Sequence, residues 1–111
     1  MRLIPAFAVV FLVAMAASGM ATSQTHAFNL TIRNHQFEPV ELEIPAGQKI
    51  ELHVTNADAT PEEFESPSLH REKVVAAGQT VTIYIGPLPP GRYEFFGEFN
   101  PKSARGAIIA K

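Results

Sequence analysis

Hydrophobic and polar residues alternate along most of the chain beyond residue 27. Apolar side chains recur at every second position in four segments, 28–33, 41–44, 50–56 and 81–85. Side chains of an extended strand point alternately to the two faces of a sheet, so this period predicts half-buried strands. Two shorter segments, 92–96 and 107–110, are predicted as further strands, the last of them buried.

Turn signals separate these segments. Pro45-Ala46-Gly47, Ala77-Gly78 and the Gly- and Pro-rich segment 86–91 all lie between predicted strands. Residues 57–73 lack a clear period and are predicted as a long loop with one short strand or turn inside it, after which Val74-Val75 starts a further strand. A second loop is predicted over 97–106. About seven short strands without a helix-period segment predict an all-β sandwich.

The first residues have a different pattern. Leu3 to Ala17 is an unbroken run of apolar residues and Pro behind Arg2, and small residues follow it. The run is shorter than the roughly 18 residues that a transmembrane helix needs. We therefore expect residues 1–27 to be a signal peptide, cleaved after Ala21 or after Ala27, and residues 28–111 to be the exported domain. The expected location is the periplasm, without stable membrane insertion after cleavage.

Composition narrows the chemistry of the expected domain. The chain has no Cys, and its three Met residues, Met1, Met15 and Met20, all lie in the expected leader. The exported part would therefore contain no sulfur, which excludes disulfides, thiolate nucleophiles and thiolate or thioether metal ligands. The formal net charge of −2 argues against nucleic acid or anionic lipid as a partner.

One acidic segment is the strongest candidate for chemistry. It reads Glu62-Glu63-Phe64-Glu65 and is followed by His70. If Phe64 points into the core of an extended segment, Glu63 and Glu65 share the opposite face, where two carboxylates favour a cation. Oxygen ligands with one imidazole suit iron, manganese or Cu(II). The alternative is an ordinary solvated loop, since Arg71 and Lys73 lie beside these acids.

The C-terminal stretch 93–109, Tyr-Glu-Phe-Phe-Gly-Glu-Phe-Asn-Pro-Lys-Ser-Ala-Arg-Gly-Ala-Ile-Ile, resembles the ligand loop of cupredoxins. In that family a Tyr-x-Phe-x-Cys strand end precedes His-Pro, Met, Gly and a hydrophobic last strand. The segments 34–39, 44–47 and 56–58 also resemble the strand and turn signature of the family. The resemblance implies a cupredoxin-like Greek-key β-sandwich, and it is nearest to the EfeO-type domain of periplasmic iron-uptake systems.

The departures from the family pattern fall at the copper ligands. The ligand Cys corresponds to Gly97, the second His to Asn100 and the Met to Ala104 or Arg105. The first His falls near Glu62 or Glu63. All four ligands of a blue-copper site are therefore replaced.

The EfeO-type resemblance implies a different metal site. A Glu-aromatic-Glu segment is proposed to bind metal in that branch, and the corresponding residues here are Glu63-Phe64-Glu65. The family fold brings its two long loops to one pole, which would place Glu98 and His70 near Glu63. The predicted metal ligands are thus Glu62, Glu63, Glu65, His70 and Glu98.

These expectations define two rival functions. The first is a periplasmic metal-binding protein that handles iron, or Cu(II), by delivery or Fe(II)/Fe(III) redox. It would act beside a membrane iron permease or another periplasmic iron-binding protein, and a ferroxidase-like activity would be consistent with carboxylate ligands. The second is a metal-free interaction module that docks onto a partner protein. A blue-copper electron carrier is disfavoured because the chain lacks Cys.

Overall fold

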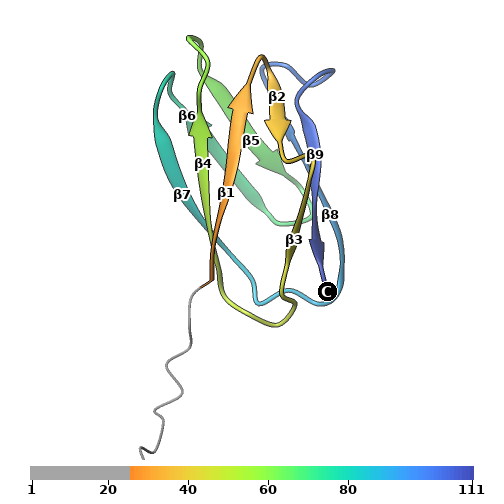
Figure 1. Ribbon diagram of the computed structural model, residues 1–111. Helices are drawn as coiled ribbons and strands as arrows, with labels where there is room; N and C mark the ends of the chain where they lie inside the picture. Colours follow the sequence, from red (N-terminus) through yellow and green to blue (C-terminus); the bar gives the residue numbers. More distant parts are fainter. Residues whose placement is uncertain (1–25) are drawn as a thin grey trace, which may run out of the picture.

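The computed structural model describes residues 26–111, which form a two-layered β-sandwich of nine strands (Figure 1). Their bounds are β1 His26–Arg33, β2 Gln36–Glu38, β3 Glu41–Ile44, β4 Ile50–Asn56, β5 Glu62–Ser66, β6 Arg71–Val75, β7 Thr80–Ile85, β8 Gly91–Gly97 and β9 Arg105–Ala110. The expected signal peptide lies outside the described residues except for its last two. Since β1 begins at His26, cleavage after Ala21 would leave this strand whole, whereas cleavage after Ala27 would shorten it.

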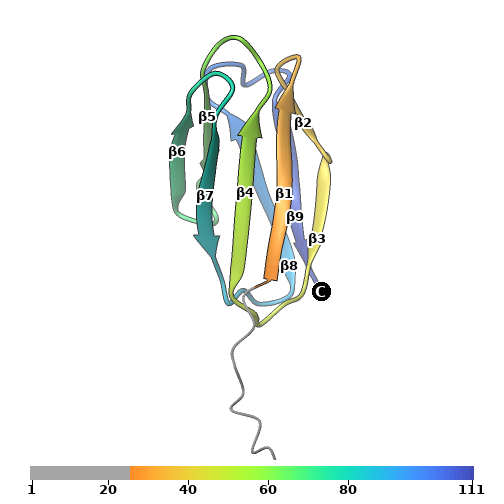
Figure 2. The same cartoon turned by 60° about the vertical axis from the view of Figure 1, so that its left-hand side comes forward.

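The strands form two sheets with the orders β2-β1-β4-β7 and β3-β9-β8-β5-β6. Neighbours are antiparallel except for β1 with β4 and β3 with β9, which are parallel. The turned view shows the edge strands β6 and β7 on one flank (Figure 2). There the guanidinium Nε of Arg71 donates a hydrogen bond to the carbonyl oxygen of Tyr84 at 2.9 Å. The predicted all-β sandwich is confirmed, with nine strands in place of about seven.

The loop prediction for residues 57–73 was wrong. This segment contains β5 and most of β6, which pair as an antiparallel hairpin with Glu65 opposite Glu72. Val74 and Val75 end a strand and do not begin one. Residues 71–75 show no alternation of apolar and polar positions because β6 is an edge strand with four of its five residues exposed. A strand with so little buried surface does not need apolar residues at every second position.

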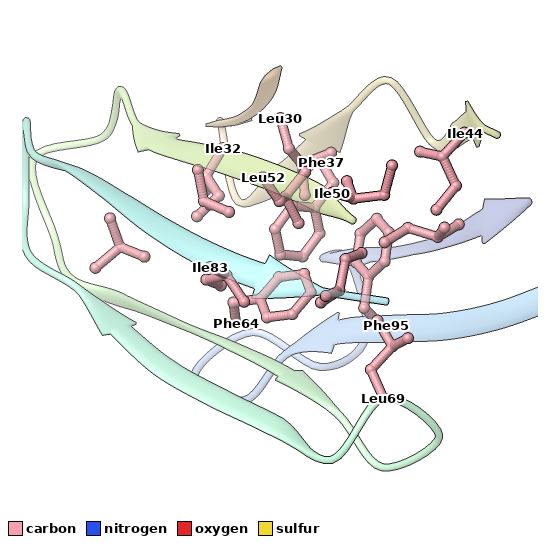
Figure 3. Close-up of a cluster of buried hydrophobic side chains, with 14 of the residues drawn as sticks. Leu30, Ile32, Phe37, Ile44, Ile50, Leu52, Phe64, Leu69, Ile83 and Phe95 are labelled. Carbon is pink, nitrogen blue, oxygen red and sulfur yellow. The ribbon is translucent and has the colours of Figure 1, made fainter. Parts of the chain in front are cut away.

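The core lies between the sheets and is built from the alternating apolar positions (Figure 3). Three aromatic rings occupy its centre. The ring centroid of Phe37 lies 4.9 Å from that of Phe95 and 6.2 Å from that of Phe64, both in edge-to-face geometry, and those of Phe64 and Phe95 are 5.2 Å apart. Edge-to-face packing is a favoured arrangement of aromatic pairs, so these rings connect both sheets and orient β5.

The end of the sandwich called here the loop pole carries the β1–β2 turn, residues 57–61 and residues 98–104, together with the β6–β7 turn (Figure 1). The Asp58 carboxylate accepts hydrogen bonds from the backbone N–H groups of Asn34 and His35. The Ser103 hydroxyl donates to the His35 carbonyl oxygen at 2.7 Å. These contacts fix the segments that flank β5 and the end of β8. No helix of the described residues could cross a membrane.

Candidate metal centre

The β5 strand sends its glutamates to opposite faces of the five-stranded sheet. Phe64 is fully buried in the core, and Glu62, which shares its face, is only 1% exposed. Glu63 and Glu65 therefore lie on the outer face, as the sequence predicts. Glu63 is nonetheless 9% exposed, because side chains of adjacent strands and the β8–β9 loop crowd it.

Four glutamates gather on this outer face and are called here the glutamate cluster: Glu63, Glu65, Glu72 and Glu98. One carboxylate oxygen each of Glu63, Glu65 and Glu72 lies within 4.8 Å of the others. Glu72 arrives because it pairs with Glu65 across the hairpin. Glu98 arrives because its backbone N–H donates to the carbonyl oxygen of Glu63 at 2.9 Å.

The crowding of the carboxylates raises the pKa of two of them, Glu63 and Glu65. A hydrogen bond shared with Glu72 raises the pKa of Glu63 to about 7, helped by burial and by repulsion from Glu72, Glu65 and Glu98. A hydrogen bond shared with Glu98 likewise raises the pKa of Glu65, with burial and like charges adding to the effect. Two carboxyls can share a hydrogen bond only if one is protonated. Protons held between these carboxyls therefore reduce the repulsion among them, which a bound cation could also do.

Acids elsewhere on the same sheet face have basic partners. Arg92 lies 2.7 Å from the Glu41 carboxylate and 3.6 Å from that of Glu94, and Lys111 lies 2.7 Å from that of Glu43. In contrast, no ion pair of residues 26–111 includes a member of the glutamate cluster. Uncompensated negative charge is thus confined to the β5, β6 and β8 end of the face.

Two predicted ligands lie apart from the cluster. His70 is in the turn between β5 and β6, at the opposite end of the hairpin from Glu63, with a φ of 53°. It lines an open hollow of about 420 Å³ that Glu65 and Glu72 also line, but its ring is not among the grouped ligand atoms. The Glu62 side chain points to the inner face. The structure therefore brings together Glu63, Glu65 and Glu98 of the predicted set.

Sequence reasoning missed Glu72 as a candidate ligand. Its position depends on the hairpin register that places it opposite Glu65. A prediction of 62–66 and 71–75 as paired strands would have revealed it, since directly opposed residues of an antiparallel pair share a face.

The residues that the cupredoxin resemblance places at the copper position lie at the loop pole, and they do not fit copper. Gly97, Asn100 and Ala104 surround Glu62, so no sulfur or imidazole faces this position. A Cβ on Gly97 would lie 2.6 Å from Cδ of Glu62 and 2.7 Å from Cβ of Ala104. Both Glu62 carboxylate oxygens already accept hydrogen bonds. A cysteine at position 97 would clash with the chain as it is folded.

Comparison with known proteins agrees with this architecture. The structure resembles auracyanin A, a blue copper protein of Chloroflexus aurantiacus, with a TM-score of 0.68 at 11% identity over 79% of this chain and 100% of that one. A purple cupredoxin of Nitrosopumilus maritimus gives a TM-score of 0.60 at 20% identity over 75% and 98%. At these identities the likeness concerns the fold alone, which is that of a cupredoxin.

The sequence itself shows the family. The model of the cupredoxin-like domain matches residues 4–110, and the chain belongs to this family. An uncharacterized protein of Rickettsia prowazekii is 49% identical over 80 residues, which cover 72% of this chain. The match spans 64% of that relative's length.

Proposed function

We propose that this protein binds iron at the glutamate cluster and handles it, by delivery or by Fe(II)/Fe(III) redox, outside the cytoplasmic membrane. The observation that carries the proposal is that Glu63, Glu65 and Glu72 converge on a sheet face, with Glu98 of the adjoining loop beside Glu65, whereas the other acids of that face are paired with Arg or Lys. Unpaired, crowded carboxylates are costly for a folded protein unless protons or a cation neutralise them. A metal ion is the neutralising partner that a binding protein would exploit.

The ligand chemistry favours hard or borderline ions. All four candidate ligands offer carboxylate oxygens, which suit iron and manganese better than Cu(I), whose preferred ligands are sulfur atoms. Carboxylates also favour the higher charge of Fe(III), so bound iron would have a lowered reduction potential. The raised pKa of Glu63 further means that metal binding at neutral pH releases a proton.

The proposed partner is a membrane iron permease or another iron-binding protein of the periplasm. The support is the EfeO-type resemblance of Glu63-Phe64-Glu65 together with the expected leader. The cluster lies on the outer face of the sandwich and next to the loop pole, so a partner could reach the bound ion without unfolding the domain. Such access suits transfer of the ion better than permanent storage.

The decisive experiment compares two double variants. Glu63→Gln with Glu65→Gln removes two carboxylates from the cluster, and Glu41→Gln with Glu43→Gln removes two from the same sheet face where they pair with Arg92 and Lys111. Affinity for Fe(II) and Mn(II), measured under anaerobic conditions by competition with a chromophoric chelator, should fall about tenfold or more in the first variant only. Equal loss of metal affinity in both variants would mean that the affinity depends only on the overall charge of the protein.

Growth on ferrous iron under iron limitation tests the physiological role. A strain that lacks the protein should be rescued by the wild type and by the Glu41→Gln, Glu43→Gln control, but not by the Glu63→Gln, Glu65→Gln variant. Rescue by every folded variant would leave a metal-free docking module as the function. If the Glu63→Gln, Glu65→Gln variant fails to rescue, metal analysis of protein purified from its native compartment identifies the physiological ion, because Cu(II) outcompetes iron at most such sites in vitro.

A further inference from the structure

The carboxylate of Glu62 forms a buried junction at the loop pole. Its Oε1 accepts hydrogen bonds from the backbone N–H groups of Glu63 at 3.0 Å and Phe99 at 2.9 Å. Its Oε2 accepts one from Nδ2 of Asn100 at 2.6 Å. With the side chain 1% exposed, these donors replace the water that a carboxylate would otherwise bind. The junction joins β5 to a loop more than thirty residues further along the chain.

This junction occupies the position where the cupredoxin resemblance places copper. The metal in that arrangement would connect residue 62 to residues 97, 100 and 104. Here the connection is made by hydrogen bonds, and Gly97 leaves room for the carboxylate, since any Cβ there would lie 2.8 Å from Oε1 and 2.6 Å from Cδ of Glu62. The loop is also closed on itself, because Gly97 N–H donates to Ala104 O at 2.8 Å and Ala104 N–H to Asn100 O at 2.9 Å.

We propose that the Glu62 carboxylate acts as an internal crosslink in place of a metal ion, so that the loop pole is fixed without metal and is closed to it. Three donors satisfy both carboxylate oxygens, and no imidazole or sulfur is present to complete a coordination sphere. Displacing the crosslink would leave Asn100 and the Phe99 N–H without their acceptor in a partly buried site, which is costly. A metal ion therefore gains too little here to compete.

The crosslink also has a positioning role, which rests on the function proposed above. Phe99 and Asn100, which bind the Glu62 carboxylate, directly follow Glu98. Glu98 in turn is held to β5 by the bond from its N–H to Glu63 O. Glu62 thus fixes, from the inner face, the loop that supplies one carboxylate of the outer cluster.

Substitutions at Glu62 and Asn100, made singly and together, test the crosslink. Asn100→Asp places two carboxylates at 2.6 Å and should lower Tm by about 10 °C or more. Adding Glu62→Gln restores a donor opposite an acceptor and should recover most of that loss. Glu62→Gln alone should cost little, since the Asn100 amide can turn round to accept from the new donor. An unaffected Tm in Asn100→Asp, or no recovery in the double variant, would overturn the crosslink.

Metal exclusion is tested where the outer cluster cannot contribute. In a variant that replaces all four members of the glutamate cluster, Glu63, Glu65, Glu72 and Glu98, by Gln, Zn(II) added in excess should leave the NMR signals of the Asn100 side-chain amide and the Phe99 N–H unshifted. Movement or loss of these signals on Zn(II) addition would show metal at Glu62 and would overturn the proposal. Failure of the outer cluster to bind iron would leave both outcomes of this test unaltered, so the two proposals fail separately.

Discussion

Neighbouring residues of β5 meet opposite environments although their side chains are identical. Glu62 is surrounded by hydrogen-bond donors, whereas Glu63 is surrounded by other carboxylates. The first arrangement favours a carboxylate, and the second favours a proton or a cation. The period of the strand, which alternates faces at each residue, is the origin of this difference.

The crowding at Glu63 predicts an unusual dependence of stability on pH. The pKa of Glu63 is raised from an ordinary value near 4.5 to about 7, so the folded state holds its proton more tightly than the unfolded state does. The contribution of this group to stability is then present below about pH 4.5 and is lost as pH rises through about 7. The urea concentration at the unfolding midpoint of the wild type should therefore decrease as the pH rises from 5 to 7.5.

The matched variant for that measurement is Glu63→Gln, which cannot titrate. Its urea midpoint should decline less over the same interval, so that its advantage over the wild type grows toward pH 7.5. Parallel curves for the two proteins would show that Glu63 has an ordinary pKa in the folded state.

A second residue-scale prediction separates Glu63 from a histidine that also lies on an outer sheet face. His53 is on the four-stranded sheet, where its ring contacts Thr82 at 3.3 Å and Glu51 at 3.6 Å, away from the glutamate cluster. Glu63→Gln should weaken binding of divalent metal about tenfold or more, whereas His53→Ala should change it by less than about twofold. Competition with a chromophoric chelator measures both. Similar losses would move the site away from β5.

The elements differ in how far their sequence reveals them. Strands β1 and β4, whose polar and apolar positions alternate, were predicted nearly to their ends. The β5–β6 hairpin was not, because β6 lies at the sheet edge and its exposed residues carry no period. The same loss of period hid Glu72. The shared face of Glu63 and Glu65 was predictable, since it needs only the direction of Phe64, whereas their third partner depends on register between strands.

The aromatic centre predicts which elements depend on the core. Phe95 of β8 is buried against Phe37 and Phe64, so Phe95→Ala should lower the free energy of unfolding by about 3–5 kcal/mol. The control is Phe99→Ala at the loop pole, where the side chain is 50% exposed and the loss should be under about 1 kcal/mol. Urea unfolding measures both, and equal losses would contradict the assigned core.

The whole molecule keeps the cupredoxin sandwich without the cupredoxin ligands. The chain has no Cys at all, and the intense band of blue copper proteins requires a copper–thiolate bond. Protein loaded with Cu(II) should therefore be almost colourless in the visible range. A strong charge-transfer band in the absorption spectrum would contradict the absence of cupredoxin ligands from the loop pole. It would also contradict the glutamate cluster as the site where Cu(II) binds.

Because β9 is the only strand of residues 26–111 that pairs with β3, the five-stranded sheet cannot form completely until β9 is available. Residues 41–44 find their partners only at residues 107–110, and the N–H of Lys111 still bonds to Ile44. Until residues 105–110 of β9 are available, β3 has no neighbour in the described five-stranded sheet and one side of β8 stays open. Contacts so distant in sequence close slowly. Before the final strand docks, the unpaired edges of β3 and β8 remain open to other chains, so a helper that holds the polypeptide apart during this interval would raise the yield of native protein.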